Sequence, residues 1–188
     1  MTHPHLAAQC RLDTPLGLMT AAATDKGIAG LWFDEQLHHP GELDVPVNPG
    51  HRWLKSADAY LRRYFEADWP AQRSLPLDLH GTPFQRAVWQ ALLALPAGQI
   101  STYAAIAVQA GSPAGVRAAG AAIGRNPVSV LVPCHRVVGS DGSLTGYAGG
   151  IERKRALLLH EGVPLLKSLD ARGAVQQTVP PVKPGRAR

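Results

Sequence analysis

Turn-forming residues divide the first part of the chain into short apolar stretches, and this regular spacing of turns limits what the region can fold into. Apolar stretches at 9–13, 17–23 and 28–33 are separated by turn residues around Pro15 and around Gly27. Short apolar stretches bounded by Gly, Pro, Asp and Thr are typical of strands joined by tight turns. We therefore predict a small antiparallel β-meander over residues 8–33.

The next segment consists of a predicted loop followed by a predicted helix. Residues 38–50 are rich in His, Pro, Gly and Asn, which favours a loop. Over residues 51–66 apolar side chains recur at helical spacing: Trp53, Leu54, Ala57, Leu61, Tyr64 and Phe65. This pattern predicts one amphipathic helix, followed by a connector at 67–81. We expect residues 1–80 to form an N-terminal lobe of sheet, helix and connector.

The second half opens with a helix-start signal. Thr82, Pro83 and Gln85 fit a capping box with proline at the first helical position. A second helix is predicted to begin after Ser101 or Thr102 and to run to about residue 110. A third is predicted over about 114–124, after a Ser-Pro cap at 112–113, and a fourth over 151–160. The second and third, joined by a short turn, are similar to a helix-turn-helix.

These elements predict an α/β (α+β) fold of two lobes. The first is the small antiparallel sheet with its helix. The second, over residues 81–166, is mainly helical and contains the helix-turn-helix and a loop that carries Cys134. Residues 167–188 are basic and hold few large apolar side chains, so we expect a disordered tail.

The third predicted helix of the second lobe consists almost entirely of Ala and Gly. Such a helix can pack closely inside a core, or it can approach a nucleic-acid groove with Arg117 as its one long cationic side chain. The charge of this half is compatible with the second interpretation, because residues 84–160 hold seven Lys/Arg against two Asp/Glu. A merely soluble basic surface is the alternative.

The chain shows no membrane or secretion signal. No run of about 18 apolar residues occurs, and the first residues lack a basic region followed by an apolar stretch. The two cysteines, Cys10 and Cys134, cannot form a disulfide framework or a four-thiolate zinc site. We expect a cytoplasmic protein whose lone thiols stay reduced.

Cys134 stands beside His135, and this pair is a candidate nucleophile with its base. Glu161 is a candidate third member that would hold the imidazole in one tautomer. The alternative is that Cys134 is a small buried hydrophobic residue. Likewise, Asn126 before Pro127 could do no more than initiate a turn, without any role in a site. The glycine-rich segment 145–150 could be an ordinary loop.

The segment 123–138 resembles the active-site segment of the O6-alkylguanine-DNA alkyltransferases, also called methylated-DNA–protein-cysteine methyltransferases. The specific signature is Pro133-Cys134-His135-Arg136 followed by two β-branched residues. The resemblance extends over residues 82–162 and includes 98–103, the small-residue helix, 146–150 and 160–162. The N-terminal half resembles the family only in its pattern of elements.

The resemblance implies a direct-reversal repair reaction that each molecule performs once. Cys134 would accept the alkyl group, and His135 would act as its base through a bridging water. Glu161 would orient His135, Asn126 would brace the turn that carries the cysteine, and Tyr103 would give a proton to the departing guanine. A thioether is not a leaving group, so the transfer would be irreversible.

The resemblance also implies the substrate and the way in which it is bound. The substrate would be O6-alkylguanine in double-stranded DNA, with O4-alkylthymine as a further substrate, bound in the minor groove with its nucleotide flipped out. Arg117 would fill the vacated place. The pocket would be lined by Pro133, Val137, Tyr147, Ala148 and Gly149. Further DNA contacts would come from Thr102, Ser112, Gly115, Ala118 and Arg125. We expect a monomer without cofactor or metal.

Three other functions are compatible with parts of the sequence. Alkyltransferase-like proteins bind the same lesions without repairing them, but they typically have Trp in place of the acceptor thiol. A transcriptional regulator would need sequence-specific base contacts, which a small-residue helix supplies poorly. A cysteine hydrolase would turn over repeatedly and need no DNA.

Overall fold

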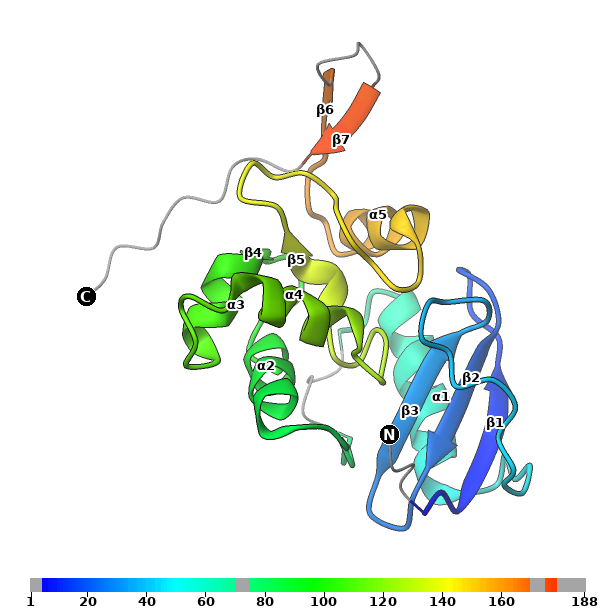
Figure 1. Ribbon diagram of the computed structural model, residues 1–188. Coiled ribbons are helices and arrows are strands. Elements are labelled where there is room, and N and C mark those ends of the chain that lie inside the picture. The colour runs from blue at the N-terminus through cyan, green and yellow to red at the C-terminus, as the bar shows by residue number, and fades with distance from the viewer. Residues whose placement is uncertain (1–4, 70–74, 170–174, 179–188) are drawn as a thin grey trace.

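The structure is a computed structural model that describes residues 5–69, 75–169 and 175–178. Its N-terminal lobe holds an antiparallel sheet of β1 (Ala8–Leu12), β2 (Met19–Ala23) and β3 (Ile28–Phe33), in that order. Helix α1 (Arg52–Phe65) packs against this sheet (Figure 1). The predicted meander and the amphipathic helix are therefore confirmed, with strand ends shifted by one or two residues.

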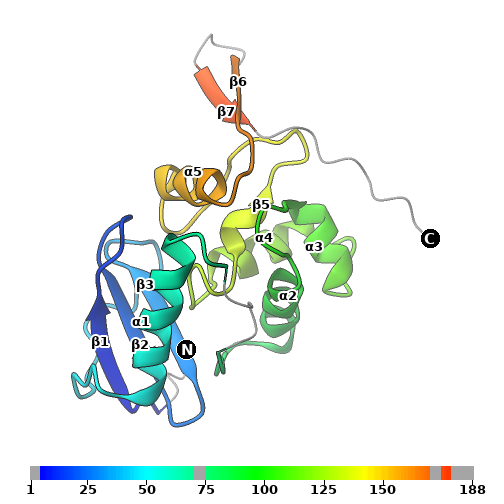
Figure 2. The ribbon, with the colours of Figure 1, turned by 180° about the vertical axis from the view of Figure 1, so that it is seen from behind.

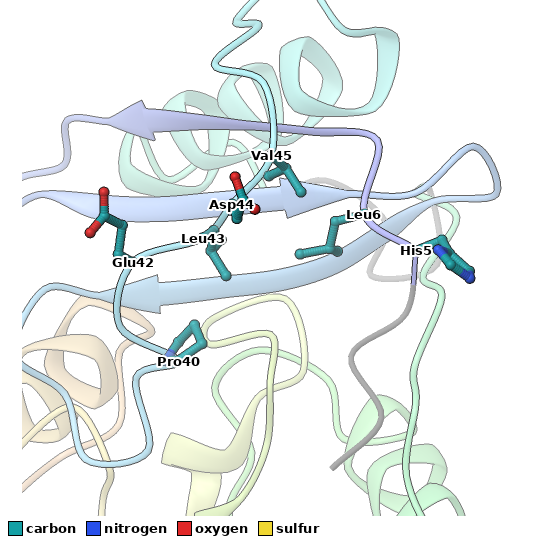
Figure 3. A pocket seen from close by; sticks show the side chains of 7 residues that line it. All are labelled: His5, Leu6, Pro40, Glu42, Leu43, Asp44 and Val45. Carbon is teal, nitrogen blue, oxygen red and sulfur yellow. The ribbon is translucent and has the colours of Figure 1, made fainter.

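The loop after β3 crosses the opposite side of the sheet from α1 and closes a cavity there. The Gln9 side chain on β1 donates to the carbonyls of Leu43 and Val45, at 2.8 and 2.9 Å. Figure 3 shows this loop above the strands, with His5 near one end. The cavity of about 430 Å³ is lined by His5, Leu6, Pro40, Glu42, Leu43, Asp44 and Val45.

The C-terminal lobe consists mainly of short helices, as the view from behind shows (Figure 2), with one short parallel strand pair. Its elements are α2 (Pro83–Leu93), β4 (Ser101–Thr102), α3 (Tyr103–Gln109), α4 (Val116–Gly124), the one-turn 3₁₀ helix η1 (Cys134–Arg136), β5 (Val137–Val138) and α5 (Ile151–His160). The capping box at Thr82 is present, since Gln85 N donates to Thr82 Oγ1 and Thr82 N donates to Gln85 Oε1. Gly162 follows α5 with φ of 76°, as a C-terminal glycine should.

In this half one helix boundary differs from the prediction and one feature was missed. Helix α4 begins at Val116 rather than near residue 114, because Gly115 N bonds to Ser112 O in a tight turn that delays the helix. The parallel pairing of β4 with β5 was not predicted, because two-residue strands carry no periodic signal.

Part of the segment for which we predict a disordered tail forms paired strands. Strands β6 (Leu166–Leu169) and β7 (Val175–Thr178) pair as an antiparallel hairpin, which projects away from α5 in Figure 1. Main-chain pairing between two short strands needs no large apolar side chains. The rest of the predicted tail, at 170–174 and 179–188, lies outside the described residues.

The two lobes share one hydrophobic core. A single cluster of buried side chains extends from β1, β2, β3 and α1 to α2, α3, α4 and the segment before Cys134. Main-chain bonds join the lobes as well: Leu31 N donates to Pro127 O at 2.9 Å, and Ser129 N donates to Leu31 O at 2.8 Å. Strand β3 thus holds the segment that leads to the cysteine. Within the described ranges, no helix is long and apolar enough to cross a membrane.

Candidate active site

Cys134 begins η1, directly after a buried and tightly turned segment. Its side chain is 4% exposed, and Val130 in the preceding turn has a φ of 70°. Asn126 holds this turn together: its Nδ2 donates to Val132 O at 2.8 Å, and its Oδ1 accepts from Val128 N at 3.0 Å. The same Nδ2 lies 3.0 Å from Cys134 Sγ. The amide that shapes the turn therefore also donates to the sulfur.

The electrostatic surroundings of the thiol have opposing effects. Burial raises the pKa of Cys134, while the Asn126 hydrogen bond and the charge of Lys154 lower it, with a net rise. The thiol is therefore protonated at neutral pH, and it needs a nearby base before it can act as a nucleophile.

His135 and Glu161 form a buried pair beside the cysteine. His135 Nε2 lies 2.9 Å from Glu161 Oε1, and His135 is fully buried. Burial lowers the pKa of His135 despite the carboxylate, so the imidazole is neutral at pH 7. The proton of the neutral ring sits on Nε2, because a carboxylate accepts it. Nδ1 is left as the acceptor, and it makes no hydrogen bond within the described part of the chain.

Glu161 has a second partner that the sequence analysis missed. Arg136 forms a bidentate pair with it, Nε to Oε2 at 2.8 Å and Nη2 to Oε1 at 2.7 Å. Burial alone would raise the pKa of Glu161, but the bonds from His135 and Arg136 hold it well below its usual range. The residue after the Cys-His pair thus keeps the carboxylate ionised inside the protein.

Lys154 is a second residue that sequence reasoning missed. It is fully buried on α5, and its Nζ donates to Val137 O and Thr145 O, both at 2.6 Å. Burial lowers its pKa to about 8. Tyr103 reaches the same loop, donating from its hydroxyl to Thr145 O at 2.8 Å. No sequence signal indicated this role of Lys154, because a lysine within a predicted helix normally indicates a solvent-exposed position.

Three of the five residues expected to line the pocket lie beside the cysteine segment. Pro133 and Val137 are buried on either side of η1, and the Tyr147 ring lies 6.5 Å from the His135 ring, centroid to centroid. A Cβ added to Gly149 would meet the Tyr147 ring at 2.6 Å, so this position has no room for a side chain. The carbonyl of Ala148 accepts from Leu37 N at 2.8 Å, which ties the loop to the N-terminal lobe.

The residues expected to contact DNA fall into two groups. Arg117, Ala118 and Arg125 are exposed on α4 or at its end. The opposite face of α4 is buried through Ala119, Ala122 and Ile123, so the small residues serve both close packing and an open outer face. The other three are partly buried: Thr102 caps α3 by accepting from Ala105 N, and Ser112 and Gly115 form the turn before α4.

The structure thus brings Cys134, His135, Glu161 and Asn126 together, and places Tyr103 at the loop beside them. This arrangement can remove a proton from a buried thiol and direct the thiolate at an electrophile. Among the described residues, no group of three or more His, Cys, Asp or Glu side chains is placed to hold a metal ion. The cavity in Figure 3 shares no residue with this site.

Comparisons with known proteins agree on one family. The 6-O-methylguanine DNA methyltransferase, DNA binding domain family matches residues 83–163. A methylated-DNA–protein-cysteine methyltransferase of Salmonella typhimurium is 52% identical over 129 residues, which cover 69% of this chain and 72% of that protein. One of Mycobacterium tuberculosis is 43% identical over 147 residues, which cover 78% and 87%.

Solved structures show the same likeness. Mycobacterium tuberculosis OGT in complex with DNA matches with a TM-score of 0.77 and 41% identity, over 83% of this chain and 93% of that one. The O6-methylguanine-DNA methyltransferase of Pyrococcus kodakaraensis matches with a TM-score of 0.60 and 26% identity, over 83% and 99%.

Proposed function

The chain belongs to the methylated-DNA–protein-cysteine methyltransferase family, and from this premise we propose that it repairs O6-alkylguanine in duplex DNA by taking the alkyl group onto Cys134. The observation that carries the proposal is the thiol itself. Cys134 Sγ accepts a hydrogen bond from Asn126 and stands next to a neutral histidine whose other nitrogen is held by a carboxylate.

The first step is removal of the thiol proton. The proton of Cys134 passes to Nδ1 of His135, through a bridging water. The imidazolium that forms keeps its Nε2–H bond to Glu161, whose negative charge stabilises it. The thiolate is stabilised by the Asn126 amide and by the positive charge of Lys154.

The second step is an in-line displacement at the alkyl carbon. The bond from Sγ to carbon forms as the bond from carbon to guanine O6 breaks, and the electron pair stays with the guanine. Protonation of the base makes it a better leaving group, and Tyr103 is the donor that we propose. Its hydroxyl is bonded to the loop at Thr145 O and Gly146 O, so it exchanges these bonds for one to the base when substrate binds.

The protein reaches its substrate by rotating the nucleotide out of the duplex, because Cys134 is almost completely buried and a stacked base cannot approach it. Helix α4 enters the minor groove with its small outer face, and exposed Arg117 takes the place of the flipped base. The DNA complex of the Mycobacterium tuberculosis relative supports DNA as the partner. O4-alkylthymine presents a similar alkyl-oxygen bond and is included as a second substrate.

Each molecule acts once and alone. The product is a thioether, which cannot leave, and Cys10 is buried in β1 of the other lobe, away from η1. The site draws all its side chains from one chain, so we propose a monomer.

Intact-mass measurement after incubation with duplex DNA containing O6-methylguanine tests the proposal. We expect a gain of one methyl group, mapped to Cys134 by peptide analysis and absent in Cys134→Ser. Cys10→Ser is the matched control and should be methylated like the unaltered protein. Lesion-dependent DNA binding without any mass gain would instead identify a lesion-binding protein that does not repair.

A further inference from the structure

We propose that Tyr64, in the N-terminal lobe, is a positioning residue for the reaction at Cys134, acting through Glu161. Tyr64 lies at the C-terminal end of α1, 97 residues before Glu161 in the chain. Its hydroxyl donates to Glu161 Oε1 at 2.7 Å, in a bond buried from solvent. The inference rests on the proposed function, because it concerns the same site.

Three donors converge on the oxygen that faces the histidine. Glu161 Oε1 accepts from Tyr64 at 2.7 Å, from Arg136 Nη2 at 2.7 Å and from His135 Nε2 at 2.9 Å. The charge on Oε1 is thus divided, and the longest of the three contacts is the one to His135. Tyr64 therefore both fixes the position of the carboxylate and limits how strongly it attracts a proton on the imidazole.

Contacts between Tyr64 and His160 hold the ends of helices α1 and α5 together. His160, which precedes Glu161, has its Nε2 at 2.7 Å from Tyr64 O. A carbonyl only accepts, so this nitrogen carries a proton and donates. The His160 ring also packs at 5.3 Å from the Tyr64 ring and at 5.7 Å from the Phe65 ring, centroid to centroid. The ends of α1 and α5 are therefore locked, which leaves the Tyr64 hydroxyl little freedom to point elsewhere.

The direction of the effect follows from the charges around the pair. Without the Tyr64 hydroxyl, Oε1 presents more negative charge to His135, so the imidazolium is stabilised and the pKa of His135 rises. Because the neutral imidazole is the base, transfer should then fail at a higher pH than in the unaltered protein. The other titratable groups near the pair stay in place in such a variant: Arg136, Lys154, Tyr147, Cys134 and Tyr60.

The test compares Tyr64→Phe with Tyr60→Phe. Both residues are buried on α1 one turn apart, both lie in the field of Glu161 and Arg136, and both substitutions remove only a hydroxyl. The Tyr60 hydroxyl makes no hydrogen bond within the described residues, so Tyr60 is the matched control. Single-turnover methyl transfer from duplex DNA is followed from about pH 5.5 to 9, and DNA affinity is measured in parallel.

For Tyr64→Phe we expect unchanged DNA affinity, a transfer rate lower by about 3- to 10-fold, and an acid limb moved up by about half a pH unit or more. Tyr60→Phe should match the unaltered protein. A Tyr64→Phe profile that superimposes on the unaltered one overturns the proposal, as does an equal shift in Tyr60→Phe or a loss of thermal stability without any shift.

A second readout separates this inference from the proposed function. The pKa of the His135 imidazole can be followed by NMR in all three proteins, whether or not they transfer an alkyl group. A higher pKa in Tyr64→Phe alone supports the role of Tyr64 even if the unaltered protein is never methylated. An unchanged pKa overturns that role even if methylation occurs.

Discussion

Replacing Glu161 by Gln should destabilise the whole protein as well as the site. The carboxylate neutralises Arg136, which is 3% exposed, through two bonds of 2.7 and 2.8 Å. A buried charge that loses its opposite partner typically costs about 3–5 kcal/mol of unfolding free energy. Gln keeps the shape of Glu161 but not its charge, so it cannot neutralise the guanidinium. We expect a loss in this range.

The assay is urea unfolding at pH 7.5 together with a thermal scan. For a chain of this size, each kcal/mol corresponds to roughly 2–4 °C, which predicts a decrease of about 6–20 °C in Tm. The control is Glu152→Gln, which replaces an exposed carboxylate in the first turn of α5, the helix that ends just before Glu161. It should change stability by less than about 1 kcal/mol.

The stability difference between the unaltered protein and Glu161→Gln should also depend on pH, and its direction can be checked. The folded-state pKa of Glu161 lies below its model-peptide value of 4.5, so its stabilising contribution is fully present above pH 4.5. That contribution is lost as the pH falls from 4.5 toward the folded pKa. The stability difference between the unaltered protein and Glu161→Gln should therefore narrow below pH 4.5. A Tm within about 2 °C of the unaltered protein at pH 7.5 would refute the reasoning that Glu161 neutralises a buried charge.

Three further predictions concern other parts of the molecule. Burial lowers the pKa of Lys154 from 10.5 to about 8, so between pH 8 and 10.5 the unfolded chain binds more protons than the folded one. As the pH rises through this window, the unfolding free energy of the unaltered protein should therefore increase by about 2–3 kcal/mol relative to that of Lys154→Met. Urea-unfolding free energies of the two proteins that change in parallel with pH would contradict this. Thr82→Ala removes the acceptor for Gln85 N and should cost about 0.5–2 kcal/mol in urea unfolding, whereas Thr82→Ser should cost less. Arg117→Ala should slow methyl transfer from duplex DNA by roughly ten-fold or more while leaving Tm and transfer from a free O6-alkylguanine base unchanged, since Arg117 is exposed; equal slowing on both substrates would argue against its role in flipping.

Local signals predicted those elements that local interactions stabilise. The capping box at Thr82 is satisfied within four residues, and the predicted helix over 151–160 ends two residues before Gly162, which adopts a positive φ. The meander followed from its turn residues in the same way. The signature around Cys134 identified the family, because a motif of adjacent residues is readable without knowledge of the fold.

The contacts that complete the site join residues far apart in the sequence, so local patterns could not predict them. Arg136 was visible only as part of the signature, and nothing in its neighbourhood indicated that it neutralises Glu161, 25 residues later. Lys154 sits on a helix where a lysine normally faces solvent, yet two carbonyls, one on β5 and one in the loop that follows it, hold it inside. The late start of α4 depends on the turn that ends at Gly115, and the tail hairpin depends on strand pairing that composition does not reveal.

The amino-acid sequence by itself determined the meander, the main helices, the family and the candidate nucleophile with its neighbours, since these depend on residues that are close together in the chain. Only the tertiary structure decided which donors share the Glu161 carboxylate. The shared core and the bonds between β3 and the cysteine segment place the end of α1 against the end of α5, and this brings Tyr64 to a carboxylate 97 residues away. Contacts over such separations arise from packing, which no single stretch of sequence encodes.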